Sequence, residues 1–161
     1  MRAGALFSAR TQNSYKLHPR FCAGVAMAFG MGEGEIEIIL GPTTFTPQET
    51  MNGKVKISLP KATVARSITV EFYGEVENGN KFERVFRAAQ VLGEERTYKN
   101  GETFDFSLTI PEQAKPPEAQ GTFGSFQDLF VPKPHSWYIE AKIDIPLSPD
   151  IKSRISVYMR R

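Results

Sequence analysis

The sequence has few of the residues on which most enzyme sites depend. Its 161 residues include one cysteine, Cys22, and two histidines, His18 and His135. A single cysteine cannot form a disulfide within the chain, and these three residues are too few for a zinc site built from cysteine and histidine. We therefore expect a fold without disulfide bonds, and we expect neither a bound metal nor a cofactor.

Long apolar runs and a strong charge of either sign are also missing. No stretch approaches the roughly 18 uncharged apolar residues that a membrane-spanning helix needs. Twenty basic and 18 acidic residues give a formal net charge of +2, which is too small to indicate nucleic acid as a main partner. With 40% hydrophobic and 24% charged residues, the composition is typical of a soluble globular domain, and we expect it to be cytoplasmic.

Phenylalanine, proline and glycine are well represented. The chain has 12 Phe, five Tyr, 11 Pro and 13 Gly. Phe and Tyr favour strands, whereas Pro and Gly favour turns. This composition predicts an all-β sandwich or barrel.

The first 32 residues differ from the rest of the sequence. Up to Gly30 they carry four basic residues and no acidic one: Arg2, Arg10, Lys16 and Arg20. These cations interrupt any apolar core of a secretory signal, and the apolar run 21–31 is too short to span a bilayer. We expect residues 1–32 to be a basic tail that is mobile or precedes the true start. The folded domain is then 33–161, and an organelle transit peptide is the alternative for the tail.

From residue 33 onward, apolar and polar residues alternate in short segments. In 67–76, for example, Ile68, Val70 and Phe72 share one face of a predicted strand, as expected where one face is buried and the other is wet. Asn78-Gly79 suits a tight hairpin turn, and Asn100-Gly101 is expected to be a second turn, which joins 94–99 to 102–110. The predicted strands are 35–40, 54–59, 67–76, 81–92, 94–99, 102–110, 137–145 and 152–159. They indicate an all-β, antiparallel, immunoglobulin-like sandwich of about seven or eight strands.

Two segments depart from simple alternation. In 81–92 the pattern breaks around Ala88-Ala89, which indicates a bulge or a bend in the strand. Residues 112–134 are rich in Pro, Gly and polar residues and predict a long loop. Four apolar residues are expected to hold this loop against the body of the domain: Phe123, Phe126, Leu129 and Phe130.

Four segments in order resemble motifs of the arrestin-like family. They are 45–55 (FTPQETMNGKV), 67–74 (SITVEFYG), 101–111 (GETFDFSLTIP) and 136–146 (SWYIEAKIDIP). This family includes arrestins, α-arrestins, retromer subunits and prokaryotic sporulation-control proteins. Gln48 departs from the pattern, because the family usually has glycine there. Arrestins contain two sandwiches and this chain has room for one, so functions that need the cleft between two domains are not implied.

The resemblance implies a non-enzymatic adaptor or scaffold that binds proteins. In this family the first strand is an open sheet edge, which here corresponds to 35–40. Unpaired backbone groups at such an edge can accept another strand. We therefore expect Glu35, Glu37 and Ile39 to face a protein or peptide partner. The partner can also be a second copy of the chain, and the alternative function is a self-assembling structural or regulatory protein of the sporulation-control type.

The potentially catalytic residues form no recognisable set. His135 lies in a loop before Trp137 without the spacing of a catalytic triad, and Cys22 has no base near it in the sequence. Acidic pairs such as Glu94-Glu95 are expected to be solvated edge residues. Asp128 and Asp150 are too few for a calcium site of the loop type. We expect no enzyme activity, and membrane contact at most peripheral, through the basic tail.

Overall fold

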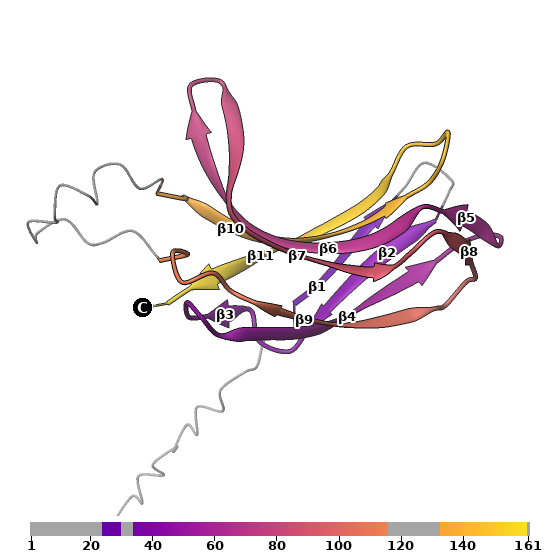
Figure 1. Cartoon of the computed structure of the whole chain (residues 1–161), viewed down its shortest axis with the longest axis horizontal. Helices are drawn as coiled ribbons and strands as arrows, with labels where there is room; N and C mark the ends of the chain where they lie inside the picture. The colour runs from indigo at the N-terminus through magenta and orange to yellow at the C-terminus, as the bar shows by residue number, and fades with distance from the viewer. Residues whose placement is uncertain (1–23, 30–33, 116–132, 161) are drawn as a thin grey trace, which may run out of the picture.

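The structure is a computed structural model that describes residues 24–29, 34–115 and 133–160. All regular elements in these three ranges are strands, and they form two sheets packed face to face, with a small third sheet at one end (Figure 1). The strands are β1 (Gly24–Phe29), β2 (Glu35–Leu40), β3 (Thr44–Phe45), β4 (Thr50–Ser58), β5 (Thr63–Ala65), β6 (Ser67–Asn78), β7 (Lys81–Gly93), β8 (Arg96–Tyr98), β9 (Thr103–Thr109), β10 (Ser136–Asp144) and β11 (Ile151–Met159). No helix in the described ranges could cross a membrane.

One layer is a four-stranded sheet in the order β1-β2-β4-β9, and all its pairs are antiparallel. The other layer is a five-stranded sheet in the order β3-β11-β10-β6-β7. Its pairs are antiparallel except that of β3 with β11, which is parallel and two residues long. Strands β5 and β8 form a separate antiparallel pair at one end of the sandwich (Figure 1).

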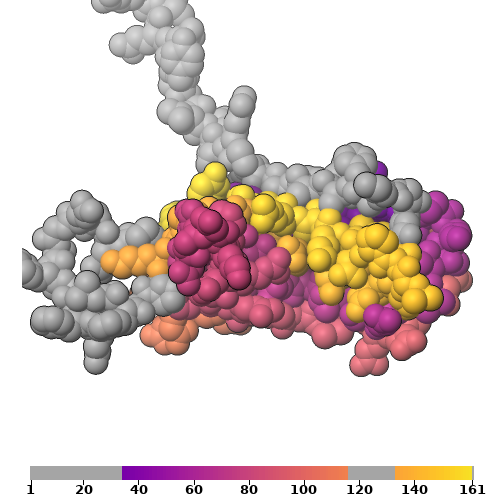
Figure 2. All heavy atoms as spheres, turned by 90° about the horizontal axis from the view of Figure 1, so that it is seen from above, coloured from indigo at the N-terminus to yellow at the C-terminus, as the bar shows by residue number. Residues whose placement is uncertain are grey.

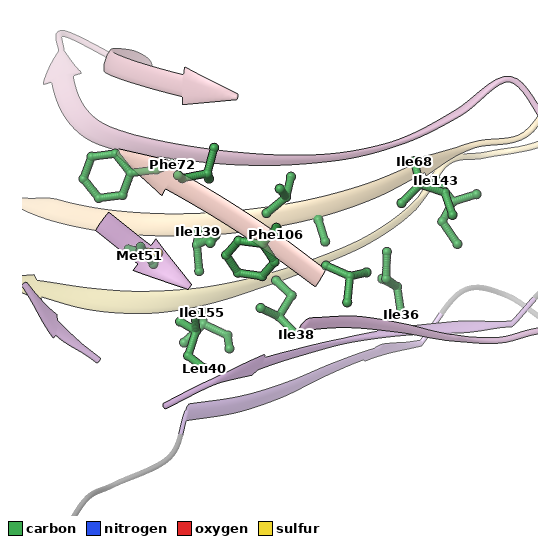
Figure 3. Close-up of a cluster of buried hydrophobic side chains, with 14 of the residues drawn as sticks. Ile36, Ile38, Leu40, Met51, Ile68, Phe72, Phe106, Ile139, Ile143 and Ile155 are labelled. Carbon is green, nitrogen blue, oxygen red and sulfur yellow. The ribbon is translucent and has the colours of Figure 1, made fainter. Parts of the chain in front are cut away.

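The core lies between the two large sheets and is built from the alternating apolar residues of both. Figure 3 shows Phe106 among branched aliphatic side chains that come from β2, β6, β10 and β11. Ile36, Ile38, Ile68 and Ile139 have no exposed surface, and Phe106 is 3% exposed. Within the described residues, every buried side-chain nitrogen or oxygen has a hydrogen-bond partner. The predicted all-β sandwich is therefore confirmed, together with the alternation from which it was inferred.

The strand count differs from the expected seven or eight, because β1, β3 and β5 were not predicted. β3 and β5 are only two and three residues long, too short for a period-two pattern to show. β1 lies inside the segment that we expected to be a tail. The expected domain boundary at residue 33 thus falls between two paired strands, while residues 1–23 and 30–33 are outside the described part of the chain.

Both predicted Asn-Gly turns join consecutive strands, and Asn78-Gly79 closes a hairpin, whereas the strands on either side of Asn100-Gly101 pair with β5 and β4 and not with each other. Gly79 has φ +64° between β6 and β7, and Gly101 has φ +81° between β8 and β9. Glycine adopts this left-handed backbone conformation without a steric penalty. The side chain of Asn100 also accepts a hydrogen bond from the backbone N–H of Leu59 over 3.1 Å, so this turn is fixed to the end of β4.

Strand β7 contains two irregularities, and they lie on either side of the expected position. Near its end, Leu92 has no counterpart in β6 between the pairs Ile68↔Gly93 and Thr69↔Val91. Nearer the hairpin, Phe86 and Arg87 together oppose Tyr73. Phe86 has φ +53°, and the two-against-one count is that of a β-bulge. Because of this bulge, Phe86 packs against the core while Arg87 lies on the outer face.

Candidate interaction surfaces

The predicted binding edge, β2, is not free in the structure. β1 pairs with it along its whole length, from Phe29↔Glu35 to Gly24↔Leu40, and β4 pairs with its other side. The expectation of an open edge at 35–40 is therefore wrong for the chain as it folds here. The physical reason is that β1 uses the same backbone groups that an external strand would use.

The side chains of β2 nevertheless point as expected. Ile36 and Ile38 are fully buried on the core side, whereas Glu35, Glu37 and Ile39 are half-buried and on the opposite face. The three predicted partner-binding residues thus lie together on the outer face of the four-stranded sheet. Whether they contact a partner remains a prediction.

The sheet edges formed by β3, β9 and β7 are short, capped or irregular. β3 is two residues long. At the β9 edge, the backbone N–H of Ser107 donates to the side-chain oxygen of Gln90 over 2.9 Å. At the β7 edge, the bulge at Phe86 and a run of charged residues interrupt the strand. Short length, bulges and charges are the usual means by which proteins protect sheet edges from pairing.

A cluster of arginine, glutamate and tyrosine residues covers the outer face of the five-stranded sheet. Arg84 donates to Glu71 over 2.8 Å and to Glu140 over 2.8 and 3.0 Å. Its guanidinium carbon lies 4.0 Å from the centre of the Tyr73 ring, within the range of a cation–π contact. Arg87 also donates a hydrogen bond to Glu71. Arginines of the bulged strand β7 are thereby tied to β6 and β10.

Tyr73 is the buried centre of this cluster. It has no exposed surface, although it lies on the face opposite to the core. Its hydroxyl donates to Glu140 over 3.4 Å, and burial raises the pKa of that hydroxyl, while Arg154 acts in the opposite direction. Because its charged groups are paired with one another, the cluster fits a structural role that holds the β6–β7 hairpin against the sheet.

A smaller ion pair fixes the turn between β8 and β9. Arg96 donates to Glu102 over 2.5 Å, and Glu102 also accepts from the backbone N–H of Lys99 over 2.6 Å. The side-chain hydrogen bond from Arg96, followed by the bond from Lys99, lowers the pKa of Glu102. This is the usual effect of a cation and a donor on a carboxylate.

The lowered pKa predicts how stability depends on pH. A carboxylate whose pKa is lowered by folding stabilises the fold at pH values above its ordinary pKa of about 4.3. This stabilisation is lost as the pH falls through the folded-state pKa. We expect Glu102→Gln to melt slightly below the natural protein at pH 7, and the difference to shrink as the pH falls and to vanish once Glu102 is protonated in the folded state. Thermal melts of both proteins from pH 7 to pH 2.5 check this. A difference that persists at the lowest pH would contradict the assignment.

The remaining candidate residues are dispersed. His135 is exposed, and its ring lies 6.0 Å from that of Phe82. Glu94 and Glu95 are exposed, and Asp150 pairs with Lys142 and Lys152. Within the described ranges, no group of three or more His, Cys, Asp or Glu side chains could hold a metal ion. Several candidates lie outside the described residues: His18, Cys22, Phe123, Phe126, Asp128, Leu129 and Phe130.

No protein-family model and no curated protein matches the chain. Among solved structures, the sporulation control protein Spo0M from Bacillus subtilis is similar, with a TM-score of 0.56 and 16% sequence identity. The match covers 81% of this chain and 51% of that one, so the chain spans about half the length of Spo0M.

A second solved structure, β-glucosidase from Listeria innocua in complex with gluconolactone, matches with a TM-score of 0.34 and 13% identity. That match covers 82% of this chain and 17% of the other, and its TM-score is too low to bear on the fold. The likeness to Spo0M agrees with the two-sheet topology. The chain therefore adopts the arrestin-like β-sandwich fold.

Proposed function

We propose that the protein is a non-enzymatic interaction module, a cytoplasmic adaptor or scaffold. Its partner binds at the edge of β2 that β1 occupies in the structure. In this proposal β1 of the same chain occupies the edge in the unbound state. A protein or peptide segment binds by taking the place of β1 and adding a strand to the four-stranded sheet.

The pairing of β1 with β2 is the observation that supports this proposal most directly. Six consecutive residues of β1 pair with six of β2, so the geometry of this edge accepts an added antiparallel strand. Strand addition obtains its affinity from backbone hydrogen bonds, and neighbouring side chains supply specificity. Here those neighbours on the outer face are Glu35, Glu37 and Ile39.

The length of the connection between the two strands bears on regulation. Residues 30–34 join β1 to β2, and a short link gives the tethered strand a high effective concentration, of the order of millimolar. A partner must compete with this strand. Segments that pair only weakly with β2 would not displace β1. A partner that also contacts the side chains on the outer face of β2 would displace it more readily.

The pKa of Glu102 indicates a structural contact, and not an acid–base site, at that position. An enzyme site commonly holds a carboxylate whose pKa is raised by burial or by a like charge. Among the described carboxylates, the resolved shift is that of Glu102, whose pKa is lowered by its ion pair. This state suits a structural contact and is the opposite of what a general acid at neutral pH needs.

Two prolines in β1 test the proposal in the full chain. In Val25→Pro/Ala26→Pro, one of the two prolines removes an N–H that faces β2, because N–H groups alternate in direction along a strand. We expect hydrogen exchange at every second residue of 35–40 to accelerate, while the amides that face β4 stay protected. Exchange is measured residue by residue by NMR. Unchanged protection throughout β2 would refute the role of β1.

A matched control and a second readout complete this test. The same substitutions at Asn13 and Ser14, outside the described strands, should leave β2 protected. A synthetic peptide of residues 23–30 should restore protection to the proline variant. If the variant instead has twice the solution mass and does not bind the peptide, the edge of β2 pairs with a second copy of the chain. That result would favour the self-assembling alternative.

A further inference from the structure

Strands β10 and β11 separate at one end of the five-stranded sheet. Their antiparallel pairing stops at Trp137↔Val157, although β10 begins at Ser136 and β11 continues to Met159. Beyond that pair, the start of β10 stays paired with β6, whereas the end of β11 pairs with β3. Figure 1 shows the two strands diverging at this end. The sheet therefore forks between β10 and β11.

A groove with a volume of about 360 Å³ lies in this fork, and it is lined mainly by apolar surface. Pro134 and Trp137 form part of one wall, and Val157 and Met159 form part of the other. Tyr158 also lines the groove and is 68% exposed. Pockets for small molecules have volumes of about 300–1,000 Å³, so this groove is at the small end of that range. It suits one large side chain better than a whole ligand.

The chain re-enters the described structure directly beside this groove. Residues 116–132 lie outside the described ranges, and Pro134 follows them by two positions. Pro134 is held in place, because it is buried and its Cγ would lie 2.6 Å from a Cβ added at Gly74. The β6–β7 hairpin lies next to the same wall (Figure 2), with the rings of Phe82 and His135 6.0 Å apart. The end of 116–132 is therefore tethered next to the groove.

Segment 116–132 carries large apolar side chains near its end. Its sequence is PPEAQGTFGSFQDLFVP, in which Leu129, Phe130 and Val131 are consecutive. Phe130 precedes Pro134 by four positions, so the Cα atoms of these two residues lie within about 14 Å of each other whatever the path of the chain. A ring on so short a tether has an effective concentration on the order of millimolar at the groove. Its burial between apolar walls is favourable through the hydrophobic effect.

We propose that the groove in the fork is a docking site for segment 116–132 of the same chain, and that the ring of Phe130 occupies it. The ring enters between Trp137 and Met159. A free ligand or a second copy must compete with this tethered ring, which is why the groove is assigned to the chain itself. Docking anchors the connection between β9 and β10 to the five-stranded sheet. Because β2 belongs to the other sheet, this proposal does not depend on the function proposed for the β2 edge.

NMR of the full chain with labelled methionine methyl groups tests this contact. Met159 forms part of the groove wall, so its methyl group should show a nuclear Overhauser effect to the ring protons of Phe130. We expect this effect to be lost in Phe130→Ala and kept in Phe123→Ala, the matched control, which removes the same side chain further from the groove. Trp137 is the only tryptophan and gives a second readout. Its fluorescence should shift to longer wavelength in Phe130→Ala and be quenched more strongly by acrylamide.

Three results would overturn the proposal: a natural protein without the effect between Met159 and Phe130, equal quenching of Trp137 in Phe130→Ala and the natural protein, or a larger change in Phe123→Ala. A Met159 signal that moves when the natural protein is diluted would mean that a second copy fills the groove, which also contradicts the assignment. The far-UV circular dichroism of Phe130→Ala should match that of the natural protein, because the described strands do not include residue 130. The first measurement needs no variant, so the test does not depend on how the variants fold.

Discussion

Replacing Phe106 by alanine is expected to lower the free energy of unfolding by about 3–5 kcal/mol, the range for a truncated core aromatic. Phe106 is 3% exposed and lies in the middle of the core (Figure 3). Its neighbour in sequence, Asp105, points away from the core, with a side chain that is 81% exposed and pairs with Lys54. Asp105→Ala should therefore change stability by less than about 0.5 kcal/mol.

Urea denaturation of the two variants and the natural protein measures this contrast directly. Equal losses of stability would contradict the alternation on which the whole sandwich depends. A second substitution tests the packing of the ring: a Cβ added at Gly53 would lie 2.5 Å from Cζ of Phe106 and 2.8 Å from the carbonyl of Ile39. Gly53→Ala should thus cost less in the Phe106→Ala background than in the natural protein.

The second large effect is expected at Trp137, whose replacement by alanine should also cost about 3–5 kcal/mol. The indole is 6% exposed and lies between two rings, with centroid distances of 5.5 Å to Phe72 and 5.9 Å to Phe86. A Cβ on Gly74 would lie 2.9 Å from this indole, so the ring rests directly on the backbone of β6. Its removal leaves a cavity that these neighbours can fill only in part.

A double-mutant cycle separates this packing from the strain of the bulge. In the natural protein, Phe86→Gly relieves the positive φ but loses the contact with Trp137. In the Trp137→Ala background that contact is already lost, so Phe86→Gly should cost at least about 0.5 kcal/mol less. Chemical denaturation of the four proteins gives the coupling. Additive effects would mean that Trp137 does not hold Phe86 in its conformation.

The sequence alone predicted the strands in which apolar and polar residues alternate with a period of two. In β10, Trp137, Ile139 and Ala141 are buried as their alternation predicts, and the Asn-Gly turns join the strands expected. Such patterns can be read because one sheet face is in contact with the core and the other with water. The arrestin-like fold followed from these strands and from the order of four short motifs.

The candidate site could not be located in the same way. β1 (GVAMAF) consists of small and apolar residues without alternation, so nothing in the sequence marks it as the strand that covers β2. The alternation in 67–76 places Tyr73 on the face opposite to Phe72, where it does lie, but the side chain is buried because Arg84 crosses from β7 to Glu140 on β10. A contact between residues 56 positions apart in the sequence leaves no local pattern.

The irregularities of β7 show a further limit. The alternation of its sequence breaks near Ala88-Ala89, yet the bulge lies at Phe86 and Arg87. A register shift redistributes side chains over both faces on either side of it. The sequence can therefore reveal that a strand is irregular, while the position of the extra residue depends on which ring reaches the core. Here that ring is Phe86, beside Trp137.

The parallel pair of β3 and β11 has a consequence for the order of folding. It joins Thr44 and Phe45 to Tyr158 and Met159. The pairing of β6 with β10 also forms late, because β10 begins more than fifty residues after β6 ends. During synthesis the four-stranded sheet and the β6–β7 hairpin can form once β9 has left the ribosome, but the facing sheet stays incomplete until β10 and β11 follow. Folding dominated by such distant pairings is slow, on the order of milliseconds to seconds. We therefore expect the nascent chain to pass through a stage in which an exposed apolar sheet face makes it prone to aggregation.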